Sequence, residues 1–376
     1  MKRGRGGRHL YEAVAMLIGT TIGAGVLGIP YTFMKSGALV GMAYILVLGL
    51  IVLAMNLYVG EISLRTKSNH MLAGYAEKYL GKWGKGIMAS AVAFGIYGAL
   101  VAYLVGEGEV LSALFGNTPM FWSILFFIAF SSLLYFKLEV IAESDLLMSS
   151  IMILLMISLA LFSIPHANLE NLQGIDTSNL FLPYGIIFFA LLGASAIPEM
   201  KAELGKRRKD LKKAIILGGA AVILLYALFA LAVVSVTGFG TTELATIGLG
   251  NLLGERMLLL GNLFAAFSMG TSFLLLGLAM KWMLHYDYRL SEKASWAATL
   301  AVPLALFLLG ARSFISIIGI TGAVAGGIEG IMIILIAMKA KKKGQRKPEY
   351  KIPLNWAIAF FFIAVFLLGI ASQFMF

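Results

Sequence analysis

Long apolar runs alternate with short polar segments along the whole chain. A helix needs about 20 apolar residues to cross a bilayer, and the runs approach or exceed that length. No polar segment reaches the roughly 50 residues of a small soluble domain. The pattern predicts one all-α integral membrane domain over residues 1–376. We expect eleven transmembrane helices, at about 10–33, 38–60, 87–114, 119–136, 140–164, 180–201, 211–237, 257–284, 294–310, 313–339 and 354–375.

The number and order of the spans suggest an inverted repeat. An odd number of spans per half makes the second half begin on the opposite side of the membrane, and five plus five satisfies this. We predict a first repeat over 10–164, a second, inverted repeat over 180–339, and a peripheral eleventh helix at 354–375. Two short amphipathic helices, at 70–81 and 241–255, are expected between spans.

Helices one and six are interrupted at corresponding places. The first contains GTTIGAGVLGIP (19–30), and the sixth contains FFALLGASAIPEM (188–200). Matching interruptions in the two halves are a good sequence pointer to a transporter binding site. At membrane depth, freed backbone groups are tolerated only where protein, water or a ligand satisfies them. The breaks therefore predict a cavity that offers amides to a carboxylate and carbonyls to an ammonium or alkali cation.

Close helix packing is the alternative explanation for the glycines. It accounts for Gly19 and Gly23 but not for Gly25, Gly28 and Pro30 beside a matching break, so we favour the cavity for the first helix. For three glycines of the tenth span we predict packing alone: Gly322, Gly326 and Gly330.

Composition and charge support a membrane location. The chain is 60% hydrophobic and 13% charged, whereas a soluble domain carries about 25% charged residues. With the N-terminus cytoplasmic and the C-terminus external, every Lys and Arg except Lys35, Arg256 and Arg312 falls in a cytoplasmic segment, as expected in a plasma or inner membrane. The run KAKKKGQRK (339–347) is interpreted as a topology signal, and the net charge of +11 indicates no nucleic-acid partner.

Three motifs resemble a known group of transporters. IGAGVLGIPYTFMKSG (22–37) resembles the first helix of the amino acid/auxin permeases and the related aromatic amino-acid permeases, within the amino acid-polyamine-organocation (APC) superfamily. AIPEMKAEL (196–204) resembles the sixth helix of that group, and TSFLLLGL (271–278) its eighth. The resemblance implies a LeuT-type fold, in which helices one and six unwind around the substrate and helices three and eight complete the site.

The resemblance also implies how an amino acid would bind. Its carboxylate would meet the amides of Ala24 and Gly25, with Thr20 and Thr21 nearby. Its ammonium would meet carbonyls of the sixth helix: Phe189, Ala190 and Leu192. On the third helix, Tyr97 or Tyr103 is a candidate to face the substrate side chain, with ordinary packing an equal alternative for both tyrosines.

The eighth helix carries a possible ion site. Ser268, Thr271 and Ser272 share one face because they are spaced i, i+3 and i+4. In sodium-coupled relatives, hydroxyls here join two carbonyls of the first helix, which map to Gly19 and Ile22. Hydrogen bonds to the preceding turn are the alternative explanation. We favour sodium, with proton coupling left open because the aromatic permeases lack the asparagine of sodium-coupled relatives and are generally regarded as proton-driven.

Carboxylates within spans are functional candidates. Two roles are expected equally for Glu329. It either carries a proton or acts in gating, or it is a buried structural group that forms hydrogen bonds. Glu107 and Glu109 lie nearer the surface, where reaching water is the simpler expectation. Glu199 is a candidate for an inner gate, with ordinary loop charge as the alternative; its possible partners are Arg5, Arg8 and Asp287.

No catalytic constellation or phosphate-binding loop is present in the sequence, and the four histidines are scattered. We therefore expect no enzyme activity and no cofactor. The sequence predicts a secondary active transporter of neutral amino acids, with aromatic ones as candidates, coupled to sodium. A proton-coupled permease or exchanger is the alternative. An amino-acid sensor that does not transport is a different class, for which we would expect a large cytoplasmic extension.

Overall fold

The computed structural model describes residues 3–135 and 145–374, and the regular elements in these residues are all helices. The first half contains α1 (Arg3–Thr21), α2 (Gly25–Ser36), α3 (Ala38–Arg65), α4 (Leu72–Phe115), α5 (Pro119–Tyr135) and α7 (Asp145–Ser163). The second half contains α8 (Leu182–Leu191), α9 (Ala196–Leu204), α10 (Leu211–Thr237), α11 (Ala245–Leu253), α12 (Glu255–Trp282), α13 (Glu292–Leu308), α14 (Phe314–Thr321), α15 (Gly327–Lys343) and α16 (Trp356–Ser372). These helices coincide with the predicted spans to within a few residues, apart from the extensions and breaks described below.

Both expected short helices are present. The first forms the start of α4, which begins at Leu72 and is kinked at Gly81. Gly81 has φ +82°, a conformation that glycine adopts readily because it lacks a Cβ. The kink therefore separates the predicted helix at 70–81 from the third span. The second short helix is α11, within the predicted segment 241–255.

The helices fit a multi-pass membrane protein. Within residues 3–135 and 145–374, five helical segments are long and apolar enough to cross a membrane, and a sixth crossing is obtained if α1 and α2, which meet at 60°, form one bent span. α5, α13 and α16 have 17 residues each, at the lower end of the length that spans a bilayer. The figure of eleven spans stays a prediction.

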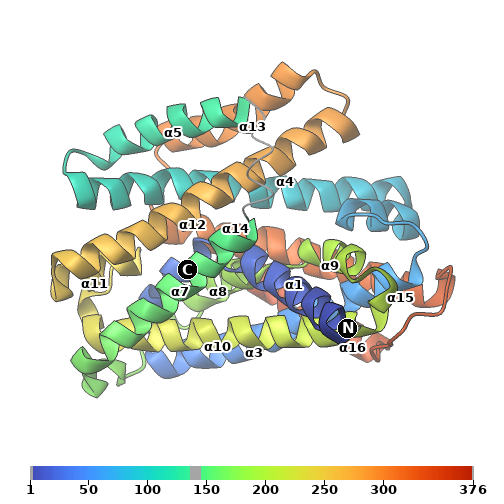
Figure 1. Cartoon of the computed structure of the whole chain (residues 1–376), viewed down its shortest axis with the longest axis horizontal. Coiled ribbons are helices and arrows are strands. Elements are labelled where there is room, and N and C mark those ends of the chain that lie inside the picture. Colours follow the sequence, from blue (N-terminus) through green and yellow to red (C-terminus); the bar gives the residue numbers. More distant parts are fainter. Residues whose placement is uncertain (1–2, 136–144, 375–376) are drawn as a thin grey trace.

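The helices form two groups (Figure 1). In one, α4 packs against α5, α12 and α13. In the other, α10 packs against α1, α2 and α3, and α8 packs against α2 and α3. α7 crosses between the groups and contacts both α10 and α12. The broken helices thus lie within one group, and helices α14 and α15 pack against α4 of the other.

The tenth-span glycines pack closely, as predicted. A Cβ on Gly326 would lie 3.0 Å from the Phe188 ring, and one on Gly330 would lie 2.6 Å from the Phe366 ring. Gly322 lies against the backbone carbonyl of Gly185 in α8. Because a side chain at any of these positions would displace a neighbour, the glycines serve close helix contact.

A buried carboxylate ties α3 to α15 and to the segment before α16. Glu61 is 2% exposed and accepts hydrogen bonds from Arg65 Nε at 2.8 Å, from Lys341 Nζ at 2.9 Å and from the Ile352 amide at 2.8 Å. We call these four groups the Glu61 anchor. Lys341, interpreted from the sequence as part of a topology signal, is therefore also half of a buried ion pair.

The same segment is bound to α3 by two tyrosines. Tyr350 donates to the Leu57 carbonyl at 2.8 Å, and Tyr58 donates to the Pro353 carbonyl at 2.8 Å.

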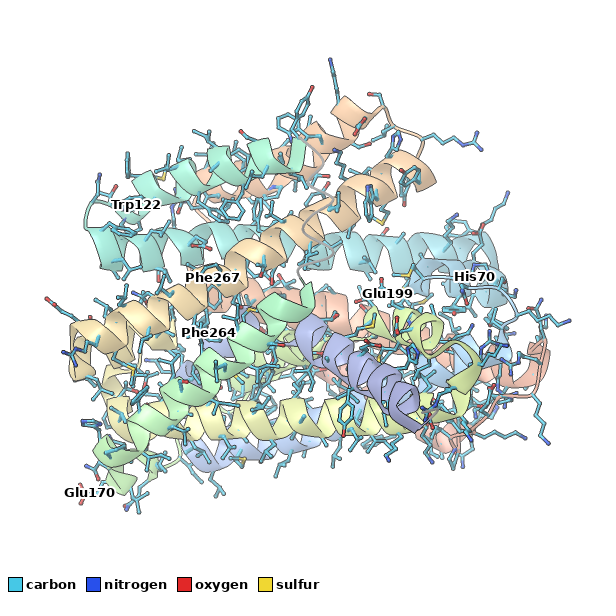
Figure 2. The ribbon with its side chains drawn as sticks, viewed as in Figure 1. His70, Trp122, Glu170, Glu199, Phe264 and Phe267 are labelled. Carbon is cyan, nitrogen blue, oxygen red and sulfur yellow. The ribbon has the colours of Figure 1, made fainter. Side chains whose placement is uncertain are left out.

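Figure 2 shows Glu199 and His70 toward one end of the molecule, with Glu170 toward the other. With the predicted orientation, the end that carries His70 is cytoplasmic.

Candidate functional site

The first break consists of Ile22, Gly23 and Ala24, between α1 and α2. The Ile22 amide still donates to the Ile18 carbonyl, while the Gly23 and Ala24 carbonyls accept from the amides of Val26 and Leu27 in α2. Among the described residues, no hydrogen-bond acceptor is paired with the amides of Gly23, Ala24 or Gly25. Three consecutive free amides thus lie at the N-terminus of α2, where the helix dipole favours negative charge.

The second break runs from Leu192 to Ser195, between α8 and α9. The Leu192 amide turns back to the Phe189 carbonyl at 3.3 Å. The Gly193 and Ala194 carbonyls accept the first amides of α9. Residues 189–192 therefore form the C-terminal end of α8, where the dipole favours a cation.

The two breaks lie against each other. A Cβ on Gly25 would lie 2.8 Å from Ala190 Cα, so only glycine allows this approach of backbone to backbone. On the other side, Gly193 lies against the Thr21 hydroxyl, which itself donates to the Leu17 carbonyl at 2.7 Å. The predicted correspondence of the breaks is confirmed in space: the amide end of α2 is next to the carbonyl end of α8.

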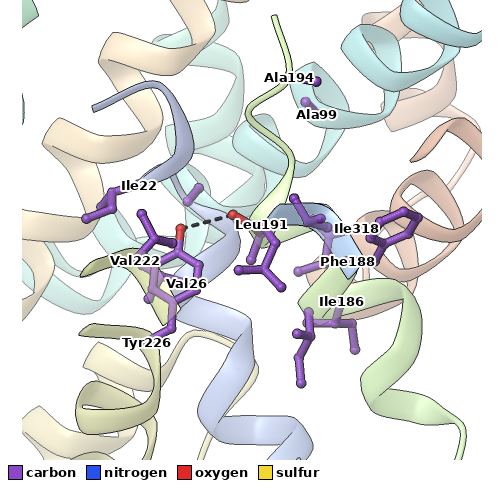
Figure 3. Close-up of a cluster of buried hydrophobic side chains, with 14 of the residues drawn as sticks. Ile22, Val26, Ala99, Ile186, Phe188, Leu191, Ala194, Val222, Tyr226 and Ile318 are labelled. Atoms are coloured by element: carbon purple, nitrogen blue, oxygen red, sulfur yellow. Dashed lines mark hydrogen bonds between the residues drawn. The ribbon is translucent and has the colours of Figure 1, made fainter. Parts of the chain in front are cut away.

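A buried tyrosine of α10 joins the breaks. Tyr226 Oη lies 2.8 Å from the Thr21 carbonyl and 3.0 Å from the Ala190 carbonyl, and the residue is 0% exposed. Figure 3 shows Tyr226 reaching between the two chain segments, within a cluster of apolar side chains that includes Ile22 and Leu191. Tyr226 is not among the site residues predicted from the sequence. A lone tyrosine within an apolar span was the available signal, because a buried hydroxyl needs a partner.

The structure separates the two tyrosines proposed on the third helix. Tyr103 is buried, and its hydroxyl bonds the Ser272 side chain. A Cβ on Gly23 would lie 3.4 Å from Ser272 Oγ and 3.9 Å from Tyr103 Oη, so these groups border the first break. Tyr97 instead donates its hydroxyl to the Ala298 carbonyl of α13 at 3.1 Å, which assigns that hydroxyl to helix packing.

The three hydroxyls of the proposed ion site differ in their surroundings. Ser268 is 0% exposed, and its hydroxyl has no hydrogen-bond partner among the described residues. Thr271 donates to the Phe267 carbonyl at 2.7 Å, the alternative expected for a hydroxyl in a membrane helix. Ser272 borders Gly23. Gly19 is half-buried and Ile22 is buried, while Thr20 is exposed.

The carboxylates are distributed differently from the expectation. Glu107 was expected to reach water, but it is 2% exposed and lies against the Gly270 backbone of α12. The expectation was wrong because α5 and α12 pack against α4 and cover this part of the helix, which the pattern along one span does not show. Glu109 and Glu329 are half-buried, and neither forms an ion pair with another described residue.

The expected inner gate lies partly outside the described residues. Glu199 is exposed, but the side chains of its proposed partners are among those not described: Arg5, Arg8 and Asp287. A different contact joins α1 to α9, at the ends of the two broken helices that lie away from the breaks. His9 Nδ1 of α1 lies 2.9 Å from Glu203 Oε1 of α9 and 3.4 Å from Glu12 Oε2.

Comparison with known proteins identifies similar transporters. The profile of the tryptophan/tyrosine permease family matches residues 7–375. Glutamine transporter 2 of Aliivibrio fischeri (strain ATCC 700601 / ES114) is 24% identical over 89% of this chain and 90% of its own length. Tyrosine-specific transport system 1 of Haemophilus influenzae (strain ATCC 51907 / DSM 11121 / KW20 / Rd) is 24% identical over 94% of this chain and 93% of its own.

Solved structures share the fold. MhsT in complex with L-phenylalanine superposes with a TM-score of 0.65 at 16% identity, covering 96% of this chain and 97% of that one. Mhp1, a nucleobase-cation-symport-1 family transporter, superposes with a TM-score of 0.62 at 12% identity, covering 97% of this chain and 91% of that one. These likenesses confirm the LeuT-type fold. The relatives are transporters, which confirms the expectation of a transporter rather than an enzyme.

Proposed function

The chain belongs to the tryptophan/tyrosine permease family, and on that premise we propose that it is a secondary active transporter of neutral amino acids, aromatic ones included, which couples transport to sodium by alternating access. One observation carries the proposal: the free amides of Gly23, Ala24 and Gly25 lie beside the carbonyl end of α8. An amino acid carries a carboxylate and an ammonium on neighbouring atoms. The paired helix ends offer complementary partial charges to these two groups.

In the proposed complex, the substrate carboxylate accepts from the amides at Ala24 and Gly25, and the ammonium donates to carbonyls at the end of α8. Tyr103 faces the substrate across Gly23. Glutamine and tyrosine, which appear in the names of the two relatives, are both neutral amino acids. The atoms nearest to Gly23, Gly25 and Gly193 belong to neutral residues, which fits a neutral substrate.

Sodium is proposed to bind between α12 and the first break. Ser268 and Ser272 would supply hydroxyl oxygens, and Gly19 and Ile22 would supply carbonyls. Support comes from Ser268, whose buried hydroxyl lacks a partner in the part of the chain that the structure describes, because such a group is costly unless something satisfies it. Thr271 would have to give up its bond to Phe267 to join the site.

We further propose a chain of eleven spans in a five-plus-five inverted repeat, with the N-terminus cytoplasmic and the C-terminus external. Alternating access would move the broken helices, α1 with α2 and α8 with α9, relative to α4, α5, α12 and α13. The division into two helix groups supports this arrangement (Figure 1). The contact between His9 and Glu203 would close the cytoplasmic side.

Uptake by purified protein in liposomes tests the proposal. We expect uptake of tyrosine, tryptophan, phenylalanine or glutamine, driven by an inward sodium gradient at equal pH. The matched control imposes a potassium gradient of the same size. Absence of uptake or exchange of any of the twenty amino acids, under sodium and proton gradients alike, would refute a transport function.

Proton coupling is the second candidate, because Glu107 lies in the interface between α4 and α12. Its carboxylate is 2% exposed, and none of the described basic residues pairs with it. A buried acidic group that can exchange a proton is a common element of ion-coupled transport. Under this candidate, Glu107→Gln flattens the pH dependence of uptake while uptake itself continues.

Glu329→Gln is the parallel test for a half-buried carboxylate of α15, and the two variants are compared over the same pH range. Glu77→Gln serves as the control, because Glu77 is an exposed member of a surface ion pair with Lys85. If the pH profile of uptake is unaltered in both Glu107→Gln and Glu329→Gln, neither carboxylate carries the coupled proton and both have structural roles.

A further inference from the structure

We propose that Tyr226 is a specificity-determining positioning residue: its hydroxyl sets the separation of the two helix ends and so selects α-amino acids over β-amino acids. The inference rests on the proposed function, since it concerns how the same site measures its substrate. Tyr226 has no contact with substrate in this proposal. It acts through the backbone that it holds.

The geometry places one donor between two acceptors. The hydroxyl has one proton, and it lies within hydrogen-bond distance of the Thr21 carbonyl at 2.8 Å and the Ala190 carbonyl at 3.0 Å. Thr21 is the last residue of α1, and Ala190 lies in the last turn of α8. Each acceptor therefore belongs to a different broken helix, within a few residues of its break.

The donor comes from a helix that is itself continuous. α10 runs unbroken from Leu211 to Thr237 and packs against α1, α2 and α3. Tyr226 is 0% exposed, so bulk water does not take over its bonds. Without the hydroxyl, two buried carbonyl oxygens would be left near each other with neither a shared donor nor a solvent partner, an arrangement that is costly and repulsive. Separation of the two segments would relieve it.

That separation matters for substrate choice. The amides at Ala24 and Gly25 follow Thr21 by a few residues, and the carbonyl of Ala190 is itself part of the end of α8. The gap between carboxylate and ammonium partners is thus set on both sides by segments that Tyr226 holds. A β-amino acid has one more carbon between its charges, a difference of about one C–C bond or 1.5 Å. A gap held for the α isomer disfavours the β isomer.

The test compares two buried tyrosines. Tyr226→Phe removes the bridging hydroxyl and keeps the ring. Tyr184→Phe is the matched control, because Tyr184 is a buried residue of α8 whose hydroxyl has no hydrogen-bond partner among the described residues. For each protein in liposomes, KM and maximal rate are measured for phenylalanine and 3-amino-3-phenylpropanoate, and for alanine and 3-aminopropanoate.

We expect the wild type and Tyr184→Phe to favour the α isomers strongly. In Tyr226→Phe, the ratio of β-isomer KM to α-isomer KM should fall by about tenfold, mainly because the KM for the α isomer rises. A tenfold change in KM is about the free energy that one hydrogen bond contributes. A general loss of packing would instead lower the maximal rate for both isomers and leave the ratio unchanged.

Three outcomes overturn the inference. One is an unchanged KM ratio in Tyr226→Phe, and another is an equal change in Tyr184→Phe. The third needs no variant and applies even if Tyr226→Phe does not fold: wild-type protein that takes α and β isomers with equal KM has no such selection. If the wild-type protein transports none of the probes, the result counts against the proposed transport function and not against the role of Tyr226. The two proposals can therefore be refuted separately.

Discussion

The Glu61 anchor and the pair of helix breaks satisfy buried polar groups in opposite ways. At the anchor, one carboxylate receives bonds from two cationic side chains and a backbone amide, all between 2.8 and 3.0 Å. At the breaks, a single neutral hydroxyl serves two carbonyls, and three amides have no partner among the described residues. Both regions are buried, but only the breaks leave hydrogen-bonding capacity unused.

This difference indicates which contacts are permanent. Hydrogen bonds to ionised groups are roughly twice as strong as neutral ones, so the Glu61 anchor holds α3, α15 and the segment before α16 together as one unit. Unpaired backbone groups and neutral bonds can be exchanged for bonds to a substrate or ion at little cost. We infer that the anchor serves stability and the breaks serve binding.

Breaking the anchor should have the largest effect on stability. Removing one partner of a buried ion pair leaves an uncompensated charge and costs about 3–5 kcal/mol. We expect Glu61→Ala to lower the free energy of unfolding by that amount, because Arg65 and Lys341 both lose the carboxylate that balances their charge, and Lys341 keeps only the Ile352 carbonyl. Thermal unfolding in detergent, followed by tryptophan fluorescence, measures the change.

Glu349→Ala is the control for the anchor, because Glu349 pairs with Arg346 in the same segment but is more exposed. Exposed pairs contribute about 0–1 kcal/mol. Equal shifts in the midpoint of unfolding for Glu61→Ala and Glu349→Ala would contradict the division between anchor and breaks.

At the breaks, the expected effect is on transport more than on stability. Gly25→Ala places a Cβ 2.8 Å from Ala190 Cα, and a backbone atom yields less easily than a side chain. Overpacking of this kind costs about 1–3 kcal/mol, and the forced separation of α2 from α8 should reduce the uptake rate by at least about tenfold.

Gly86→Ala in α4 is the matched control for Gly25→Ala, because a Cβ at Gly86 meets nothing within 4 Å. Its uptake should equal that of the wild type. Normal uptake by Gly25→Ala would show that close approach of the breaks is not needed for function.

The smallest expected effect concerns the ion. Ser268→Ala removes a hydroxyl that none of the described residues bonds, so stability without sodium should change little. If the hydroxyl binds sodium, the concentration that gives half-maximal uptake should rise by about tenfold, the effect of losing one ligand bond worth about 1.4 kcal/mol. Uptake measured against sodium concentration, with choline replacing sodium, tests this.

Thr271→Ala sharpens the comparison on α12. The Thr271 hydroxyl is already bonded to Phe267, so its loss should weaken sodium dependence less than the loss of the Ser268 hydroxyl. Substrate selectivity should remain unchanged in both variants. Sodium dependence equal to the wild type in both Ser268→Ala and Thr271→Ala would count against an ion site on this face.

Pattern and spacing predicted much of the fold. Apolar run lengths placed the helices, and α10 begins and ends at the predicted residues 211 and 237. Gly and Pro in two matching runs predicted the breaks, because these residues weaken helices whatever surrounds them. The second span was predicted to end at residue 60, but α3 continues to Arg65, and Glu61 was therefore overlooked. A charged residue at a span end has the same local pattern whether its partner is water or Lys341.

By itself, the sequence determined that the chain crosses a membrane, where its helices begin, and which two are broken, because hydrophobic length and backbone propensity are local properties. Only the tertiary structure decided that Tyr226 joins the breaks, that Tyr103 rather than Tyr97 borders them, and that Glu107 is buried. Those facts depend on which helix faces which across the fold. A side chain's partners are set by packing between distant segments, and the pattern along one helix does not contain that information.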